Sequence, residues 1–354
     1  METRKIQQVG GGTYTVSLPK EWAAAADIEP GSVVALHTHI DGTLVVRTDE
    51  DECGTRPLVL SVTAADSPSL ERALRAAYAA GIDAVELHAD GGVDDAVRRR
   101  IERVTRQLTG VTVTETTGDG VRVRSLLDPE EVSITQSVRQ LQFAALSAHR
   151  DATAAVTGPT ALERPGNRDD QVDRIVALVD RYFQRGLDSL AVMDALGLTR
   201  PELFVRWVTA RELERVADEA GHIATVANSL ESPIGGDVAD AFDDLAEDSR
   251  ALVRDAVSVA LGDADATPIR AVTTEADRVR CSAESLDRRL FEADDASYRL
   301  TRAVDSLSRT ADSAVAIAQL ALRSRLRAGC RSETPLDVSS AGRPVSRPER
   351  EPSR

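Results

Sequence analysis

Lysine is almost absent from this chain of 354 residues. Of its 43 basic residues only Lys5 and Lys20 are lysines, and 58 acidic residues leave a formal net charge of −15. Such an excess of acid excludes a protein that is basic throughout. Nucleic acid is not excluded as a partner, because salt screens long-range repulsion and binding then depends on where the few cations lie.

Cysteines, aromatics and long apolar runs are scarce as well. Cys53, Cys281 and Cys330 are far apart and form no CxxC pair, so a zinc site or a disulfide framework is not expected. No stretch approaches 18 apolar residues and the N-terminus has no apolar signal segment, which predicts a cytoplasmic protein. Aromatics make up 3% of a chain that is 42% hydrophobic. The cores must therefore be built from Ala, Val, Leu and Ile.

The first 49 residues have the pattern of a small β-domain. Strands are expected at residues 4–9 and 13–18, and Pro19 begins a short helix, where its missing N–H costs nothing. Two further strands, at residues 33–39 and 44–47, flank the dipeptide Asp41-Gly42, which is a strong hairpin signal.

A different alternation follows the expected linker at residues 50–56. Strands and helices succeed one another over residues 57–127 in the order βαβαββ, and Ser67 with Pro68 begins the first of these helices. This order predicts a compact α/β middle domain.

Apolar periodicity typical of helices takes over from about residue 128. Six helices with short connections predict two tandem three-helix bundles, at residues 129–230 and 236–328. The tail at residues 331–354 is rich in Pro, Ser and Arg and is expected to be disordered. The expected helices cover residues 129–157, 167–196, 199–230, 236–262, 268–294 and 296–328.

The N-terminal string RKIQQVGGGTYTVSLPKEWA, followed by DIEPGSVVALHTHIDGTLVV, resembles the swapped-hairpin domain of the AbrB/SpoVT/MazE family. The resemblance covers about residues 4–48. It implies a dimer in which two chains interleave their hairpins, and it implies binding to DNA.

The local chemistry agrees with a phosphate-contacting surface. Residues 1–20 contain three cations and a single acid, Glu2, and both lysines of the chain lie there. Phosphate contacts use basic side chains, hydroxyls and backbone N–H groups. The alternative is that the charges only discourage aggregation of an edge strand. The predicted DNA-binding residues are Arg4, Lys5, Thr13, Tyr14, Ser17 and Lys20.

The helical region carries a different resemblance. The strings ARELERVADEAGHIATVANSL (210–230) and RAVDSLSRTADSAVAIAQLAL (302–322) are near-copies, which indicates an internal repeat of one three-helix unit. Together with NRDDQVDRIVALVDRYFQRGL (167–187) they resemble the PhoU family. This resemblance implies control of phosphate uptake and metal binding through acidic motifs.

Residues four apart share a helix face, so two facing helices can bring carboxylates together, and a cation would relieve their repulsion. Oxygen ligands favour Mg, Mn, Ca or Fe. Such acids can equally form the solvated faces of helices. His222 is a weaker candidate for a metal ligand. Of the acids at the matching positions of the second repeat, only Asp277 and Asp312 are present, so one metal cluster is expected, in the first bundle. The predicted metal ligands are Asp169, Asp170, Asp173, Glu214 and Asp218.

Together the two resemblances imply a DNA-binding transcriptional regulator of phosphate uptake, with the operator and a second copy of the chain as partners. One alternative is an adaptor that acts on the phosphate ABC transporter without binding DNA. The other is a metal-dependent phosphohydrolase, although no P-loop or GxSxG string is present and no enzyme is expected. The composition resembles that of halophilic proteins, and a GC-rich genome favours the same residues.

Overall fold

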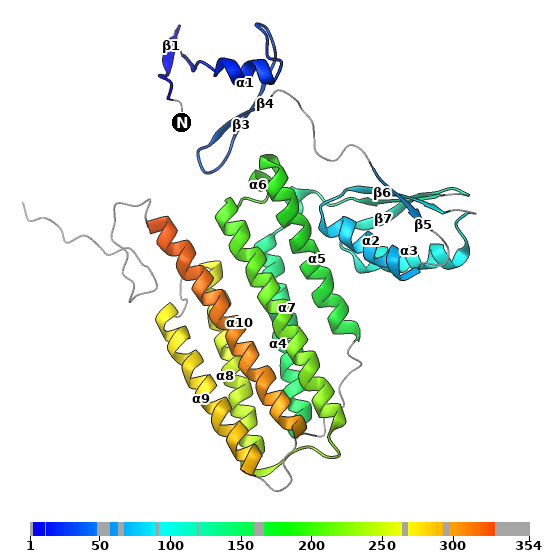
Figure 1. Cartoon of the computed structure of the whole chain (residues 1–354), viewed down its shortest axis with the longest axis vertical. Helices are drawn as coiled ribbons and strands as arrows, with labels where there is room; N and C mark the ends of the chain where they lie inside the picture. Colours follow the sequence, from blue (N-terminus) through cyan, green and yellow to red (C-terminus); the bar gives the residue numbers. More distant parts are fainter. Residues whose placement is uncertain are drawn as a thin grey trace, which may run out of the picture. The chain divides into compact units, whose positions relative to one another are not determined.

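The computed structural model describes residues 3–10, 12–47, 57–62, 67–89, 92–118, 120–158, 166–263, 268–292 and 298–329. The chain divides into two compact units, Met1–Thr55 and Arg56–Arg354. Figure 1 shows the elements of both units. The expected linker at residues 50–56 and the expected disordered tail at residues 331–354 lie outside the described residues.

In its described residues, the first unit consists of two separate antiparallel hairpins and one short helix. Strands β1 (Gln7–Val9) and β2 (Thr13–Thr15) pair with each other, as do β3 (Ala35–Thr38) and β4 (Leu44–Arg47). Helix α1 (Lys20–Ala25) lies between the hairpins in the sequence. The first two strands are shorter than the expected 4–9 and 13–18, because neither has a pairing partner beyond its own hairpin in the described residues.

The Asp41-Gly42 turn is confirmed. Gly42 has a φ of +85°, a left-handed conformation that glycine adopts without a steric penalty. The Asp41 carboxylate accepts a hydrogen bond from the Thr43 N–H over 2.9 Å. The turn thus fixes the register of β3 against β4.

The second unit begins with the expected βαβαββ layer. It comprises β5 (Leu58–Val62), α2 (Ser67–Ala79), β6 (Ala84–Ala89), α3 (Asp95–Gln107), β7 (Val111–Thr116) and β8 (Gly120–Ser125). The sheet order is β5-β6-β8-β7, in which β5 and β6 are parallel and the other pairs are antiparallel. Helices α2 and α3 cover one face of this sheet (Figure 1).

Alternation along the strands decides which side chains form the core of this layer. Val85 and Leu87 on β6 are buried, together with Val121 and Val123 on β8. The residues between them point to the opposite face, where Arg122 donates a hydrogen bond to Glu86. This period of two is the pattern of a sheet with one buried face.

The remainder of the second unit is helical. It comprises a 3-10 turn η1 (Pro129–Glu131) and the helices α4 (Ile134–Thr157), α5 (Gly166–Asp188), α6 (Leu190–Ala195), α7 (Arg200–Ser229), α8 (Gly236–Leu261), α9 (Ile269–Glu292) and α10 (Tyr298–Gly329). No helix of the described ranges is long and apolar enough to span a bilayer.

Two expected helices are corrected by the structure. The helix expected at 167–196 is interrupted between α5 and α6, because the Ser189 hydroxyl caps a new helix by accepting from the Val192 N–H over 3.4 Å. The helix expected at 129–157 begins only at Ile134, where Ser133 provides the cap.

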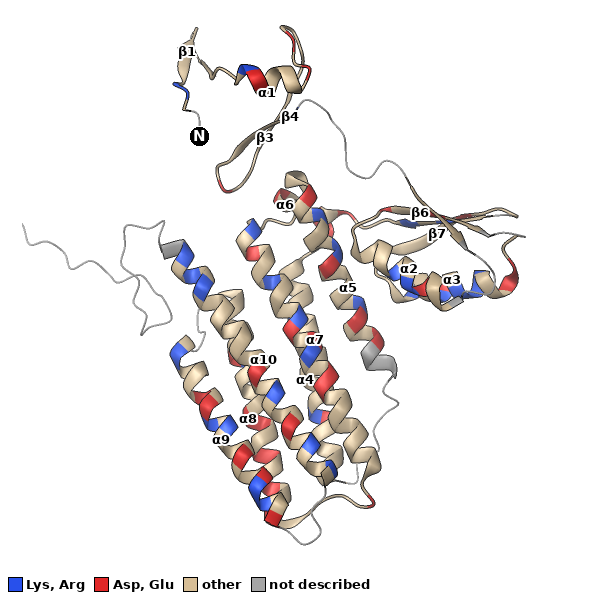
Figure 2. Cartoon of the chain, in the orientation of Figure 1, with Lys and Arg blue, Asp and Glu red and all other residues tan. Residues whose placement is uncertain are grey.

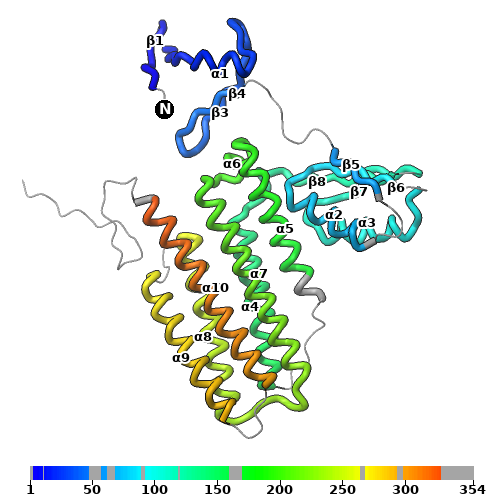
Figure 3. Tube along the Cα trace, viewed as in Figure 1, coloured from blue at the N-terminus to red at the C-terminus, as the bar shows by residue number. Residues whose placement is uncertain are grey.

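The six long helices surround one continuous apolar core rather than two separate ones. Helix α7 packs against α4 and α5, and α10 packs against α8 and α9. Direct contacts of α7 with α10, and of α4 with α8, join the two groups of three helices (Figure 3). Buried alanines such as Ala276, Ala303 and Ala311 allow the helices to approach closely.

A buried guanidinium joins the α/β layer to helix α5. Arg181 is fully buried and donates to the carbonyl oxygens of Tyr78 and Ile82, over 3.2 and 2.8 Å, and to the Asp83 carboxylate. Arg185, one turn further on, donates to the same Asp83 oxygen over 2.9 Å. Burial lowers the pKa of Arg181, and the charge of Asp83 opposes this effect.

We expect Arg181→Met to lower the free energy of unfolding by about 2–3 kcal/mol, because Asp83 and two carbonyl groups lose a buried charged donor. Denaturant unfolding followed by circular dichroism measures this change. Arg174→Met is the matched control, since Arg174 is an exposed residue two turns earlier on α5 that also reaches the layer, at the Gln107 carbonyl. An equal loss in both variants would contradict the assignment.

Candidate functional site

The residues predicted to contact DNA lie on the first hairpin and at the start of α1. Arg4 and Lys5 precede β1, Thr13 and Tyr14 belong to β2, and Lys20 is the first residue of α1. All of them, and Ser17, are exposed. Figure 2 shows basic residues before β1 and at the start of α1.

This surface is free of acidic residues over a considerable length. No Asp or Glu occurs from residue 3 to residue 20, although acids outnumber bases in the whole chain. Within the described part of the chain, neither Lys5 nor Lys20 forms an ion pair or a side-chain hydrogen bond. The two ammonium groups are therefore available to an anionic partner such as the DNA backbone.

The first unit also exposes apolar side chains that a stable domain would bury. Within residues 3–10 and 12–47, His39 is the single buried residue. Val33 is 90% exposed, Tyr14 and Ile6 are each 71% exposed, and Leu36 is 65% exposed. The described part of this unit therefore has no apolar core of its own.

The carboxylates predicted to bind metal lie on α5 and α7, which pack against each other. Glu214 is half-buried, and Arg211 donates to it over 2.8 Å. The same guanidinium lies 3.6 Å from the carboxylate of Asp180, which also accepts from the Trp207 indole over 2.7 Å. An arginine and a tryptophan thus share this face with the acids.

The electrostatics show which of the acids interact. Burial, the largest effect, raises the pKa of Glu214, and the charge of Arg211 opposes that rise. The negative charges of Asp218, Asp180 and Asp173 raise the same pKa further. The structure therefore places Asp173 and Asp218 within electrostatic reach of Glu214. It adds Asp180, which sequence reasoning missed.

Asp170 is directed elsewhere, since its carboxylate accepts from the Gln107 amide of α3 over 3.3 Å. The His222 ring pairs with Glu219 at 3.3 Å. The Asp169 side chain lies outside the described residues. Among the side chains that are described, no three His, Cys, Asp or Glu residues form a group suited to a metal ion. Metal binding stays a prediction of the PhoU resemblance.

The second repeat holds a cation of its own between its acids. Asp277 on α9 and Asp312 on α10 are the two carboxylates expected to remain there. Arg280 joins them, donating to Asp277 over 3.0 Å and to Asp312 over 2.8 Å. A single guanidinium therefore bridges this pair and offsets half of its negative charge.

Comparison with known proteins supports the reading of the first unit. Residues 7–53 match the model of the family described as "Antidote-toxin recognition MazE, bacterial antitoxin". The chain thus carries a MazE-like, AbrB-type domain at its N-terminus. No curated protein and no solved structure matches the chain. The resemblance of the helical region to PhoU therefore stays a prediction.

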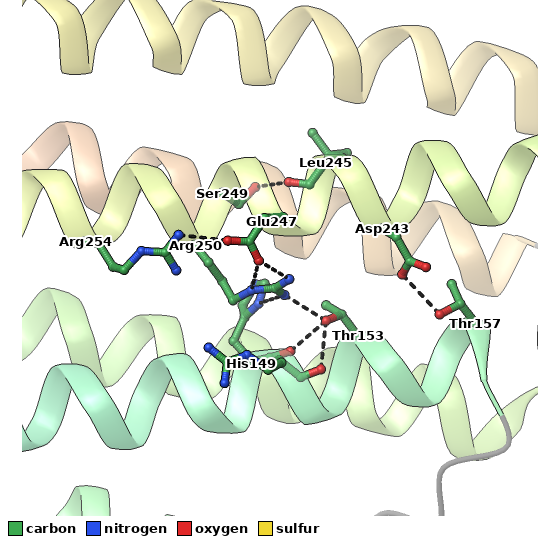
Figure 4. Close-up of polar contacts among 10 residues, drawn as sticks. His149, Thr153, Thr157, Asp243, Leu245, Glu247, Ser249, Arg250 and Arg254 are labelled. Atoms are coloured by element: carbon green, nitrogen blue, oxygen red, sulfur yellow. Dashed lines mark hydrogen bonds and ion pairs between the residues drawn. The ribbon is translucent and has the colours of Figure 1, made fainter.

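A polar cluster between α4 and α8, in which His149, Thr153 and Arg250 are buried, was not apparent from the sequence (Figure 4). Arg250 donates to the Thr153 hydroxyl over 2.9 Å and lies 3.4 Å from His149 Nδ1. Its other nitrogens pair with Glu247 over 2.9 and 3.2 Å, and Glu247 also accepts from Arg254. Helical periodicity places His149 on a buried face, but it does not reveal which side chain of a distant helix meets it.

His149 is held in its neutral form. It is fully buried, and burial together with the charge of Arg250 lowers its pKa to about 3, whereas Glu247 has a weaker opposite effect. Because Arg250 can only donate, Nδ1 of His149 acts as the acceptor, and the neutral ring carries its proton on Nε2. Protonation would place a second cation beside Arg250 inside the core.

We expect His149 to make the protein less stable as the pH falls. Its pKa is lower in the folded state than its ordinary value of about 6.5, so its contribution is fully present above pH 6.5 and is lost towards pH 3. One proton corresponds to a slope of up to about 1.4 kcal/mol per pH unit in the free energy of unfolding.

Urea unfolding between pH 4 and pH 8 measures this slope. His149→Gln should show a smaller slope than the wild-type chain. His222→Gln is the matched control, because it replaces an exposed histidine that lies outside this cluster. Identical slopes for all three proteins would contradict the role of His149.

Proposed function

We propose that this protein is a DNA-binding transcriptional regulator that acts as a dimer and controls phosphate uptake. The observation that carries the proposal is the match of residues 7–53 to the MazE family model, together with the missing core of the same segment. The proposal has three parts, which concern dimerisation, DNA binding and the phosphate response.

Dimerisation is supported by the exposed apolar residues of the first unit. Domains of about 60 residues or fewer are only marginally stable even when they bury a core, and this unit buries almost nothing. A second copy that interleaves its β1–β2 and β3–β4 hairpins would cover Val33, Leu36 and Ile6. Each apolar side chain so covered contributes roughly 1.5–3 kcal/mol.

DNA binding is supported by the charge of the same unit. A dimer presents Arg4, Lys5 and Lys20 twice, residues 3–20 contain no acid, and the Thr13 and Ser17 hydroxyls lie nearby in the sequence. Contacts from these groups to phosphates would position the protein on a duplex.

The phosphate response is supported by the repeated helical strings at residues 210–230 and 302–322 and by their resemblance to PhoU. In this proposal the helical region reports phosphate status to the DNA-binding unit. The target genes are those of phosphate uptake, and transporter components are further partners.

We expect the full chain to be a dimer whose dissociation constant rises when charge is placed on the exposed apolar surface. Val33→Asp with Leu36→Asp should yield monomers at micromolar concentration in light scattering, because the dimer would have to bury the new carboxylates. Phe291→Asp is the control, since Phe291 is 84% exposed and belongs to the second unit. A monomeric wild-type chain would contradict the proposal.

DNA binding should weaken, and its salt dependence should become less steep, when both lysines are removed. If each lysine contacts a phosphate in both copies, Lys5→Ala with Lys20→Ala lowers the slope of log affinity against log salt by about 3–4. Fluorescence anisotropy with labelled duplexes measures the slope. Arg323→Ala with Arg327→Ala is the control, because it removes two exposed cations from α10.

The choice of duplex tests the phosphate role separately. The wild-type chain should prefer DNA from upstream of phosphate-transport genes to an unrelated duplex of equal length. Equal affinity for the two would contradict the phosphate role and leave DNA binding intact. No binding to either would contradict the whole proposal.

A further inference from the structure

A cleft lies where the last turns of α7 meet the first turns of α10. It encloses roughly 350 Å³, and three of its lining residues are arginines, namely Arg299, Arg302 and Arg309. The same helices join the two groups of three helices (Figure 3). A ligand held here would contact both groups at once.

Two of the three guanidinium groups are held in place by neighbouring residues. Arg299 donates to the backbone carbonyl of Ser229, at the end of α7. Arg309 pairs with the Asp305 carboxylate, one turn earlier on α10, and lies 3.5 Å from the carboxylate of Glu219. These contacts position two planar groups in the wall of the cleft without using all of their N–H donors.

Arg302 differs from both of them. It is exposed to the cleft, and within the described ranges no hydrogen bond or ion pair joins its side chain to another residue. Many other arginines of the second unit pair with carboxylates, among them Arg139, Arg185, Arg254 and Arg278. Arg302 thus presents an unpaired guanidinium to the cleft, in addition to the two anchored ones.

The other polar groups of the cleft add one possible hydrogen-bond donor for an anion and few groups that would repel it. His222 lines the cleft, and because Glu219 lies 3.3 Å from its Nδ1, its second ring nitrogen is left for another partner. The hydroxyls of Thr225 and Ser229 donate to carbonyl groups of their own helix. Among the described residues that line the cleft, Asp305 is the single acid, and it pairs with Arg309.

We propose that this cleft binds a small oxyanion of the phosphate class, either inorganic phosphate or the phosphate group of a small phosphomonoester. Guanidinium groups match the tetrahedral oxygens of phosphate with paired, charge-assisted hydrogen bonds. The volume is near the lower end of small-molecule sites and is too small for a polymer. The proposal does not depend on DNA binding by the first unit.

Isothermal titration of the full chain with inorganic phosphate, and separately with AMP, tests the proposal. At least one of them should bind saturably with one site per chain. Arg302→Ala should weaken that binding at least about tenfold, as expected for the loss of a charge-assisted hydrogen bond, and Arg302→Lys should weaken it less. Arg323→Ala, which removes an exposed arginine further along α10, should leave the affinity unchanged.

The outcomes separate cleanly. Binding of phosphate alone assigns the site to the free ion, whereas tighter binding of AMP assigns it to a phosphomonoester. Failure of both to bind the wild-type chain would overturn the proposal. Equal affinities of Arg302→Ala and Arg323→Ala would overturn it as well, and circular dichroism confirms that both variants are folded. Because no DNA is present, these results are independent of the proposed regulatory function.

Discussion

The apolar side chains of the N-terminal strands have nothing in the described part of their own unit to bury them. Apolar burial is the main favourable contribution to folding, and a segment that leaves Val33 and Ile6 exposed gains little of it. Two short hairpins cannot offset their own conformational entropy in this way. In the proposed function, this lack of an apolar core is the reason for dimerisation, and the dimer offers DNA twice the charge of one chain.

The second unit satisfies its burial requirement alone, and arginine provides many of its polar contacts. Arg181 joins the α/β layer to α5, Arg250 joins α8 to α4, and Arg280 joins α9 to α10. A guanidinium can bridge several acceptors at fixed geometry, which a lysine ammonium does less well. In a chain with almost no lysine, arginine thus forms contacts between elements of the second unit and also lines the cleft between α7 and α10.

Much of the fold followed from local patterns. The Asp41-Gly42 turn, the βαβαββ order and the long helices depend on signals within a few residues, and the structure confirms them. The break at Ser189 was missed because apolar periodicity continues through it, whereas a single side-chain cap starts the new helix. Apolar periodicity alone does not show whether a helix continues or whether a capping residue begins a new one.

The sites were less predictable than the fold, because they depend on pairs of residues far apart in the chain. Spacing placed Asp173, Glu214 and Asp218 on facing helices, but it did not reveal that Arg211 would enter between acids or that Arg280 would bridge Asp277 and Asp312. The exposed lysines and hydroxyls of the first unit were identifiable from sequence, because the whole pattern of one compact motif lies within about 45 residues.

Hydrogen exchange of the full chain at several protein concentrations tests most directly whether a second copy completes the N-terminal unit. The amides of β1 to β4 should be protected at high concentration, and their protection should fall as dilution dissociates the dimer, while helices α7 and α10 stay protected throughout. Protection of β1 to β4 that is strong and independent of concentration down to the monomer would contradict the account.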